Sequence, residues 1–263
     1  MAVTVRRPLR PMHKRTIQSL VRANDILEAI AGTPDGCARL IDIQHATGLH
    51  KNTAFSILQT LEQLQYVERA ENGKRYRLGL RVLQLGRLMD RQFDLPAIVR
   101  PALVRLCRET GETVNLALPY ALDALVVSSL EGSYGVRATS YTGWRIYYHA
   151  GALGKAMLAH YSDEHRKAIT DGRALESFTP NTVTDEAELE RQLVTIRRNG
   201  YALDLEEFEL GATAVAAPVL DSHGQVLGAI SVSGPISRLS EARLHETAPL
   251  IVAEIGAIAP ELP

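Results

Sequence analysis

The sequence predicts two domains: a mainly α N-terminal domain that contains a winged helix-turn-helix, and a C-terminal α+β domain with a central antiparallel sheet. Three observations carry this prediction. Two helical patterns meet at a glycine near residue 48, an Asn-Gly pair then separates two short alternating segments, and mixed helix and strand patterns follow residue 95. A chain of 263 residues has room for two modest domains with separate cores.

Charge is divided unevenly along the chain. Residues 1–89 carry 14 Lys and Arg against 7 Asp and Glu, the remainder carries 15 against 23, and no acidic residue precedes Asp25. A basic N-terminal part is typical of modules that bind polyanions, because neutralising phosphates releases counterions. Charge alone fits a solvated basic face as well. The 46% hydrophobic and 22% charged residues are ordinary for a globular protein.

Export, membrane insertion and disulfide bonding are not expected. Pro8 and Pro11 interrupt the stretch where a secretory signal has its apolar run, and no apolar run is long enough to span a bilayer, so the chain is expected in the cytoplasm. Cys37 and Cys107 lack the paired spacing of a zinc site, and we interpret both as small core residues in a reducing compartment. No cofactor or metal is expected.

The first domain is predicted over residues 14–79, after a flexible basic arm over residues 1–13 that is rich in Pro and Arg. Apolar residues at three- and four-residue steps predict a helix from Thr16 to about Gly32. Further helices are predicted over residues 40–47 and 51–65. Gly48 separates these two, which is the spacing of a helix-turn-helix.

The third helix has the pattern of a recognition helix. Its predicted buried stripe consists of Ala54, Ile57, Leu58, Leu61 and Leu64. The opposite side is polar near the N-terminal end, where recognition helices contact base edges and the dipole favours phosphate; it carries His50, Lys51, Asn52, Thr53, Phe55, Ser56 and Gln59. Contact with a thymine methyl group and partial packing against the neighbouring helix suit Phe55 about equally.

A wing is predicted directly after this helix. Residues 66–70 and 75–78 alternate in polarity and flank Glu71-Asn72-Gly73-Lys74, and Asn-Gly is a strong hairpin signal. Lys74, Arg75 and Arg77 place three cations on the hairpin, where they are predicted to contact phosphates without reading sequence. Residues 80–94 are predicted to form a linker helix.

The second domain is predicted over residues 95–263. Helices are expected over residues 101–110, 154–161, 185–199 and 241–258, and strands over residues 114–119, 125–130, 214–220 and 226–233. Asp221-Ser222-His223-Gly224 separates the last two strands and is a turn by composition. The pattern is typical of an α+β sensor module.

Several motifs in order point to one family. They include residues 19–23, Thr-Gly-Leu-His-Lys-Asn-Thr at 47–53, residues 61–67 and 76–80, and, in the second domain, residues 110–114, His-Ala-Gly-Ala-Leu-Gly-Lys-Ala at 149–156, residues 200–204 and 231–235. On these motifs the chain from about Arg15 onward resembles the isocitrate lyase regulator (IclR) family of bacterial transcription factors. The resemblance implies a GAF-like effector-binding domain for a small organic acid or aromatic compound, and a homodimer or homotetramer on pseudopalindromic double-stranded operator DNA.

The resemblance also implies particular site residues. The effector pocket would be lined by Gly151, Ala152, Leu153, Asp204, Ala214, Ser231 and Ser233, and Arg22 joins the predicted DNA-binding residues. Backbone N–H groups beside two hydroxyls would suit a carboxylate. Asp204 would accept a hydrogen bond from a ligand hydroxyl or hold the loop in place. The two serines also fit the capping of strand ends.

Two positions depart from the family pattern. Ser56 stands where the family usually has a basic residue, which predicts one missing contact and a different operator. Ala214 stands where a polar or sulfur-bearing residue is common. Four aromatic residues lie close together in the sequence, namely Tyr141, Trp144, Tyr147 and Tyr148. Together with Ala214 they predict an effector that is bulkier and less polar than a two-carbon acid. A place in the core or at a subunit interface suits these aromatic residues slightly better.

Enzyme classes find little support in the sequence. The sequence of residues 151–155 resembles part of a phosphate-binding loop motif. That motif requires Gly in place of His149 and Ser or Thr in place of Ala156, so the match fails. No nucleophile elbow occurs, and the histidines are too scattered for a metal triad. We therefore predict a ligand-responsive regulator of a catabolic operon and no enzyme; the alternative is a GAF-like small-molecule sensor or an enzyme without a DNA role.

Overall fold

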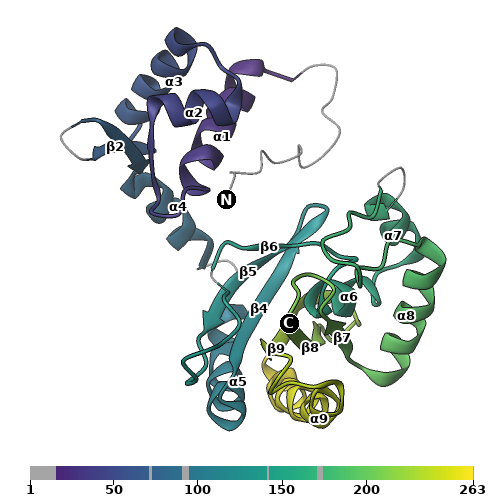
Figure 1. Cartoon of the computed structure of the whole chain (residues 1–263). Helices are drawn as coiled ribbons and strands as arrows, with labels where there is room; N and C mark the ends of the chain where they lie inside the picture. The colour runs from purple at the N-terminus through teal and green to yellow at the C-terminus, as the bar shows by residue number, and fades with distance from the viewer. Residues whose placement is uncertain (1–15, 71–72, 91–94, 141, 171–173, 263) are drawn as a thin grey trace. The chain divides into compact units, whose positions relative to one another are not determined.

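The computed structural model describes residues 16–70, 73–90, 95–140, 142–170 and 174–262. Contacts divide the chain into two compact units, Met1–Phe93 and Asp94–Pro263 (Figure 1). The predicted basic arm, the first two residues of the wing turn and Tyr141 lie outside the described residues. No helix in the described ranges is both long and apolar enough to cross a membrane.

The N-terminal unit packs helices against a small sheet. Its elements are α1 (Gln18–Ala31), β1 (Cys37–Arg39), α2 (Leu40–Thr47), α3 (Lys51–Gln63), β2 (Val67–Ala70), β3 (Arg75–Leu78) and α4 (Leu80–Asp90). The strands pair antiparallel in the order β1-β3-β2. Gly48 ends α2 in the left-handed conformation, with φ 68°, and its N–H donates to the Gln44 carbonyl at 2.8 Å. This turn places α3 directly after α2, so the predicted winged helix-turn-helix is confirmed.

The predicted buried stripe of α3 is largely correct. Ala54, Leu58 and Leu61 are buried against α1 and the sheet, and Ile57 is half-buried. The assignment of Leu64 to this stripe is wrong, because its side chain is 56% exposed. The helix ends at Gln63 and Gln65 takes a positive φ of 61°, so the chain turns away before Leu64 can face the core.

The C-terminal unit is built on a curled antiparallel sheet with the strand order β6-β5-β4-β9-β8-β7. Its strands are β4 (Thr113–Tyr120), β5 (Asp123–Leu130), β6 (Arg145–Ile146), β7 (Ala202–Leu205), β8 (Ala212–Leu220) and β9 (Val226–Pro235). Its helices are α5 (Leu95–Thr110), α6 (Ala152–Leu158), α7 (Asp163–Thr170), α8 (Glu186–Asn199) and α9 (Glu241–Ile258), followed by a 3-10 turn, η1 (Ala259–Glu261). The predicted α+β class with a central antiparallel sheet is confirmed.

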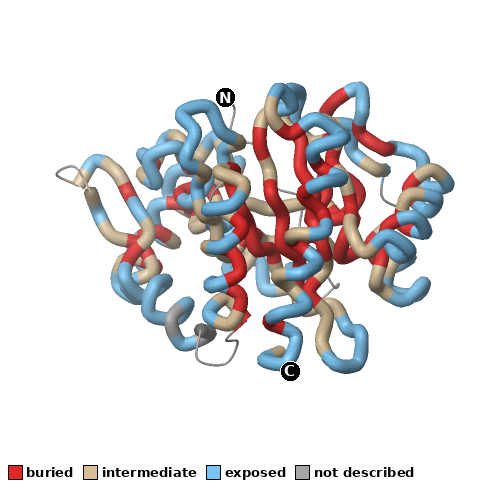
Figure 2. Tube along the Cα trace, turned by 90° about the horizontal axis from the view of Figure 1, so that it is seen from below, coloured by how far each residue is buried: buried red, intermediate tan, exposed pale blue. Residues whose placement is uncertain are grey.

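Helices cover both faces of this sheet. The sequences of its central strands are therefore almost continuously apolar and do not alternate with polar residues. α5 and α9 lie side by side on one face, where they bury Leu116, Ile230 and Val232 (Figure 1). α6 packs on the opposite face and α8 packs against α6. Figure 2 shows the central strands almost entirely buried, while the helices expose their outer sides.

Several element boundaries differ from the predicted ones. The helix expected from Pro101 begins at Leu95 and continues through that proline. The helix expected over residues 154–161 spans Ala152–Leu158, and its Gly154 lies so close to the preceding chain that a Cβ there would stand 2.2 Å from the Tyr147 carbonyl oxygen. The strands β1, β6 and β7 and the helix α7 were not predicted, because their short sequences show no clear apolar period. Equally short elements were predicted where a turn separates them from a second element, at Gly48 and at Asn72-Gly73.

Candidate functional site

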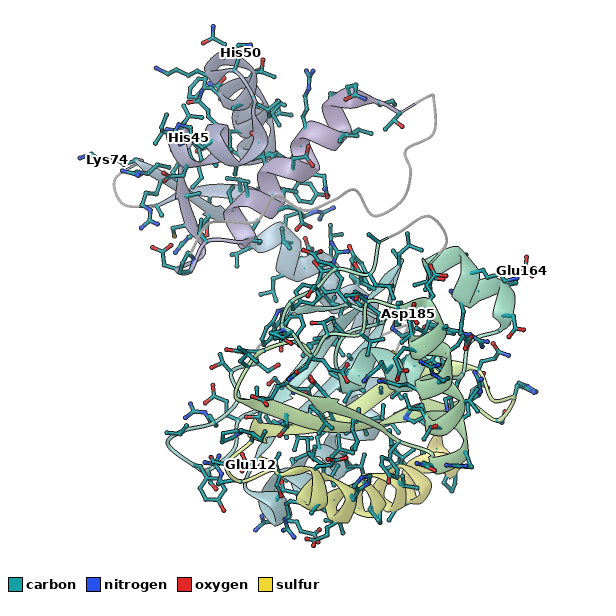
Figure 3. The ribbon with its side chains drawn as sticks, turned by 45° about the vertical axis from the view of Figure 1, so that its right-hand side comes forward. His45, His50, Lys74, Glu112, Glu164 and Asp185 are labelled. Atoms are coloured by element: carbon teal, nitrogen blue, oxygen red, sulfur yellow. The ribbon has the colours of Figure 1, made fainter. Side chains whose placement is uncertain are left out.

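The N-terminal end of α3 presents its polar residues to solvent. His50 precedes the helix with extended backbone, and no acidic residue occupies the first turn. Figure 3 shows His50 at this end of the helix and Lys74 at the tip of the hairpin. Of the residues predicted to contact DNA, Arg22, His50, Lys51, Asn52, Phe55 and Ser56 are exposed and Thr53 is half-buried. Phe55 is 37% exposed, so its ring is partly packed and still reachable.

The wing cations do not share one environment. Arg75 is half-buried, lies 2.7 Å from the Asp35 carboxylate and donates to the Cys37 carbonyl, so it holds the sheet to the loop before β1. Arg77 lies 2.8 Å from Glu68, its cross-strand neighbour. Lys74 is exposed and has no ion pair within the described part of the unit. The three wing cations are therefore not equally free to contact a DNA phosphate. Lys74 is the freest of the three.

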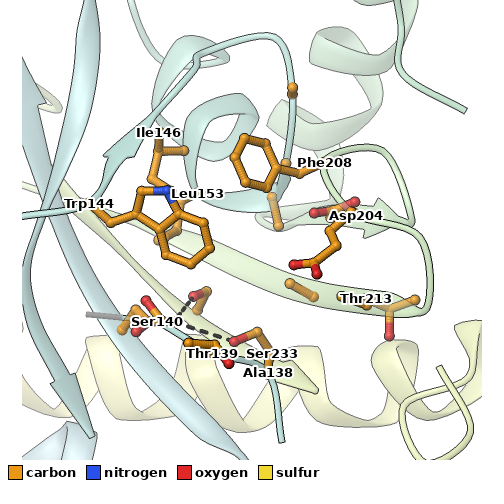
Figure 4. A pocket seen from close by; sticks show the side chains of 18 residues that line it. Ala138, Thr139, Ser140, Trp144, Ile146, Leu153, Asp204, Phe208, Thr213 and Ser233 are labelled. Atoms are coloured by element: carbon orange, nitrogen blue, oxygen red, sulfur yellow. Dashed lines mark hydrogen bonds between the residues drawn. The ribbon is translucent and has the colours of Figure 1, made fainter. Parts of the chain in front are cut away.

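A pocket in the C-terminal unit lies on the α6 side of the sheet. Its empty volume is about 630 Å³, which includes space open to solvent. Figure 4 shows Trp144, Ile146, Leu153 and Phe208 on one side and Ser140 and Ser233 on the other. The remaining lining residues are Asn115, Ala138, Thr139, Ala150, Gly151, Ala152, Asp204, Glu209, Ala212, Thr213, Ala214 and Ser231.

Strand register explains how distant residues reach this pocket. Asp204, Ala214 and Ser233 stand opposite one another on β7, β8 and β9, and Ser231 stands opposite Asn115 on β4. Paired residues, and residues two apart on one strand, share a face of the sheet. The sheet therefore brings the predicted polar residues and Ala214 onto one floor, where the small alanine leaves room above it.

Asn115 is the most enclosed amide of the pocket, with 4% of its surface exposed. Its Nδ2 donates to Ser233 Oγ at 3.3 Å and contacts Ser231 Oγ at 3.5 Å. Its Oδ1 is buried and has no hydrogen-bond partner. A buried acceptor without a partner costs free energy, so Asn115 holds its place on the pocket floor at some cost to stability.

Asp204 is a buried carboxylate at the other side of the floor. Burial, and to a lesser extent the negative charge of Glu207, raises the pKa of Asp204 to about 6. The backbone N–H groups of Glu207 and Phe208 and the positive charge of Lys155 act in the opposite direction. The Glu207 N–H donates to Asp204 Oδ1 at 2.7 Å. A Cβ on Gly151, which has φ 91°, would lie 3.4 Å from Asp204 Oδ2. Asp204 thus both holds the loop after β7 and faces the turn that starts α6.

A buried ion pair supports this wall of the pocket. Lys155 on α6, which is 2% exposed, pairs with Glu207 and also donates to Gln192 Oε1 on α8 at 2.9 Å. The Thr182 hydroxyl donates to the Glu207 carbonyl at 2.5 Å. Since Glu207 also binds Asp204 through its N–H, this pair connects α6 and α8 to the pocket carboxylate.

The aromatic residues near residue 145 divide between pocket and core. Trp144 lines the pocket and meets Phe208 edge-on, with ring centroids 5.6 Å apart. Tyr148 is buried in the core, where its hydroxyl lies 2.9 Å from that of Tyr161. Tyr147 packs on Phe178 outside the described lining. Trp144 therefore belongs to the pocket and Tyr148 to the core, and the effect of this segment on effector size stays a prediction.

Comparison with known proteins decides the family. Residues 19–71 match the IclR helix-turn-helix domain, and residues 89–258 match the bacterial transcriptional regulator IclR C-terminal domain. The chain belongs to the IclR family. It is therefore a DNA-binding transcriptional regulator with an effector-binding C-terminal domain, and its curated relatives are named as regulators and repressors, not enzymes.

IclR-family relatives resemble the chain over most of its length. It is 31% identical to the transcriptional repressor IclR of Escherichia coli, covering 90% of this chain and 86% of that protein. It is 36% identical to the regulator BhcR of Paracoccus denitrificans, covering 90% and 84%. An IclR homologue from Microbacterium hydrocarbonoxydans, solved in complex with 4-hydroxybenzoate, matches with a TM-score of 0.80 at 26% identity, covering 93% of this chain and 98% of that one.

Sequence reasoning missed several residues of the pocket in this IclR-family chain. Asn115 carried a signal, because a polar residue inside the apolar run Val114–Pro119 is unusual for a buried strand. Phe208 and the segment Ala138–Ser140 carried none, since they belong to irregular loops whose position depends on the whole fold. Of the predicted effector-binding residues, the following line the pocket described above: Trp144, Gly151, Ala152, Leu153, Asp204, Ala214, Ser231 and Ser233.

Proposed function

We propose that this chain regulates a catabolic operon in response to a small organic acid or aromatic effector bound in the pocket of its C-terminal domain. The observation that carries the proposal is the pocket itself, where residues from the four strands β4, β7, β8 and β9 and from the start of α6 converge on one floor. A regulator of this kind acts in the cytoplasm, where its operator lies. The alternative, a sensor without a DNA role, leaves the exposed face of α3 unexplained.

The lining of the pocket favours an effector with one carboxylate and an apolar body. The first N–H groups of a helix have no intrahelical acceptor, and Ala152 and Leu153 supply such groups at the start of α6. The described lining residues include Asp204 and Glu209 but no Lys, Arg or His, which disfavours a multiply charged acid. Trp144 and Phe208 suit a ring. The 4-hydroxybenzoate complex of the Microbacterium homologue supports the same effector class.

We further propose that the chain acts as a homodimer or a pair of dimers. α4 exposes apolar side chains along its length, with Leu80 74%, Leu83 56% and Leu88 51% exposed. An apolar helical face of this kind is typical of a subunit contact. Effector binding can change DNA affinity only if the effector binds one arrangement of the assembly more tightly than the other, and this coupling is reciprocal.

A gel shift with the DNA upstream of the gene tests the proposed function. The purified full-length chain should shift this DNA, with an affinity that falls steeply as salt rises. Adding an effector should change the shift without depleting the effector over time. Absence of any shift at low salt, or steady consumption of the effector, would contradict a regulatory role.

The wing provides a prediction about phosphate contacts. Lys74→Ala should weaken operator and random DNA about equally and reduce the salt slope by roughly one, because a phosphate contact carries no base code. Arg75→Ala should instead lower the thermal stability of the N-terminal unit, because Arg75 is held by Asp35 and Cys37. Equal loss of DNA affinity in both variants, with unchanged stability, would show that the two cations have the same role.

The recognition helix provides a second prediction. Asn52→Ala should reduce discrimination between the operator and its single-base variants by about 1–3 kcal/mol, because Asn52 is exposed at the N-terminal turn of α3 where side chains reach base edges. Competition gel shifts measure this quantity. Gln63→Ala, at the far end of the same helix, is the matched control and should leave discrimination unchanged. Unchanged discrimination in Asn52→Ala would remove this residue from base recognition.

A further inference from the structure

The charged side chains that line the pocket are both acidic. Asp204 lies on β7 and is 8% exposed, whereas Glu209 lies on the loop that follows this strand and is exposed (Figure 4). The other polar side chains of the described lining are hydroxyls and one amide, which carry no charge. An anion that enters the pocket therefore meets negative charge that no described lining side chain balances.

The basic side chains beside the described lining are already engaged. Lys155, on α6, forms a buried ion pair with Glu207. Arg145 stands in the chain between two lining residues, but it pairs with Asp123. The ring of His149 hydrogen-bonds to a backbone carbonyl at 2.9 Å. The two positive charges are thus balanced within the protein, and neither is left over for an anionic effector.

Asp204 itself faces mainly uncharged groups. Its partner on β8 is Ala214, and Ser233 stands opposite Ala214 on β9. The N–H of Glu207 donates to Asp204 Oδ1 at 2.7 Å. Burial, together with the Glu207 charge, raises the pKa of Asp204 to about 6, although backbone N–H groups and Lys155 oppose this rise. A modest further rise would keep this carboxyl protonated at neutral pH.

A second negative charge in the same pocket supplies that rise. When two carboxylates share one site, their repulsion makes one of them take up a proton. This repulsion acts across several ångströms and requires no contact, because it is a Coulomb interaction. Asp204 is the group that takes the proton, since an aromatic carboxylic acid has an ordinary pKa of about 4. Once protonated, Asp204 is also a hydrogen-bond donor.

We propose that the pocket binds an aromatic monocarboxylic acid together with one proton, which comes from solvent and is held by Asp204. This inference rests on the proposed effector-binding function and deepens it, because it makes effector affinity depend on pH. No covalent bond of the effector changes: the proton moves from water to a carboxylate oxygen of Asp204, and the effector stays an anion. The chain should therefore respond to lower effector concentrations at pH 6 than at pH 8.

Titration calorimetry with benzoate on the full-length chain tests the proposal at pH 6, 7 and 8. Benzoate is ionised throughout this range, so a change in affinity comes from the protein. The affinity should fall by about ten- to fiftyfold from pH 6 to pH 8, because the protonated fraction of a carboxyl with a pKa of about 6 falls steeply there. Titrations at pH 7 in two buffers with different heats of ionisation should show about one proton taken up for each benzoate bound.

Two variants separate Asp204 from the general charge of the pocket. D204N is neutral at every pH, so its benzoate affinity should vary by less than about threefold and should exceed that of the wild type at pH 8 by about tenfold. A gain in affinity cannot arise from misfolding. E209Q removes the same charge from an exposed position and should keep the wild-type pH dependence, because a solvated carboxylate stays ionised in this range. Benzamide, an uncharged ligand of similar shape, should not bind more weakly at pH 8 than at pH 6.

Three results would overturn the proposal. The wild-type affinity for benzoate could stay constant from pH 6 to pH 8 without proton uptake, D204N could keep the wild-type pH dependence, or benzoate in the millimolar range could fail to bind at pH 6. A gel shift with the upstream DNA on the same preparation separates these results from failure of the proposed function. The DNA is still shifted if only the proton coupling is wrong, whereas absence of any shift at low salt contradicts the regulatory role itself.

Discussion

Lys155→Met should lower the free energy of unfolding of the C-terminal unit by about 3–5 kcal/mol, because it leaves the Glu207 carboxylate buried and unpaired. The change keeps the length and apolar part of the side chain, so the loss reports the missing charge and not a cavity. Urea denaturation followed by tryptophan fluorescence measures it. Trp144 is the only tryptophan of the chain and lies in this unit, so the signal belongs to the unit that carries the pair.

Two controls separate the buried pair from a general effect of lost charge. Arg243→Met breaks an exposed ion pair with Glu246 in the same unit and should cost at most about 1 kcal/mol. Combining Lys155→Met with Glu207→Leu removes both charges and should recover much of the loss, because no unpaired charge stays buried. A cost below about 1 kcal/mol for Lys155→Met alone would mean that water reaches Glu207 and that the pair does not support the pocket wall.

Elements of the fold were predictable where their apolar residues repeat over several turns or where a turn signal marks their end. α2 and α9 begin and end where the sequence predicts, since each starts at a clear change of pattern and α2 ends at Gly48. α6 was shifted, because every residue in it is buried and a helix without a polar side has no period to detect. Its start depends on Gly151 and on the close approach of Gly154 to Tyr147, which are tertiary contacts.

The candidate site was predictable only in part, and for a similar reason. Family motifs supplied Asp204 and the two serines, which the register of β7, β8 and β9 then placed on one floor. The different environments of Arg75 and Lys74 could not be predicted, because Asp35 lies 40 residues before Arg75. Likewise, Asn115 and Ser231 meet across 116 residues. Pairings over such separations are set by strand topology, which local patterns do not contain.

Asp204→Asn should change how the stability of the C-terminal unit depends on pH. Burial raises the pKa of Asp204 from 3.8 to about 6 in the folded chain. The folded state therefore holds this proton more tightly than the unfolded state, and the stability that the neutral carboxyl contributes is fully present below pH 3.8 and is lost as pH rises through 6. Asparagine resembles the neutral carboxyl at every pH. The variant should thus gain on the wild type by roughly 2 kcal/mol between pH 4 and pH 7.

Urea denaturation at pH 4, 5, 6 and 7 measures this difference, and the neutral variant Ser231→Ala is the control from the same pocket. Its stability relative to the wild type should be the same at each pH, because serine does not titrate in this range. Asparagine retains an oxygen that can accept from the Glu207 N–H, so the loop after β7 keeps its contact in the variant. A difference between Asp204→Asn and the wild type that stays flat from pH 4 to pH 7 would show that Asp204 is solvated. A difference of opposite slope would show that Lys155 stabilises the Asp204 anion more than burial opposes it.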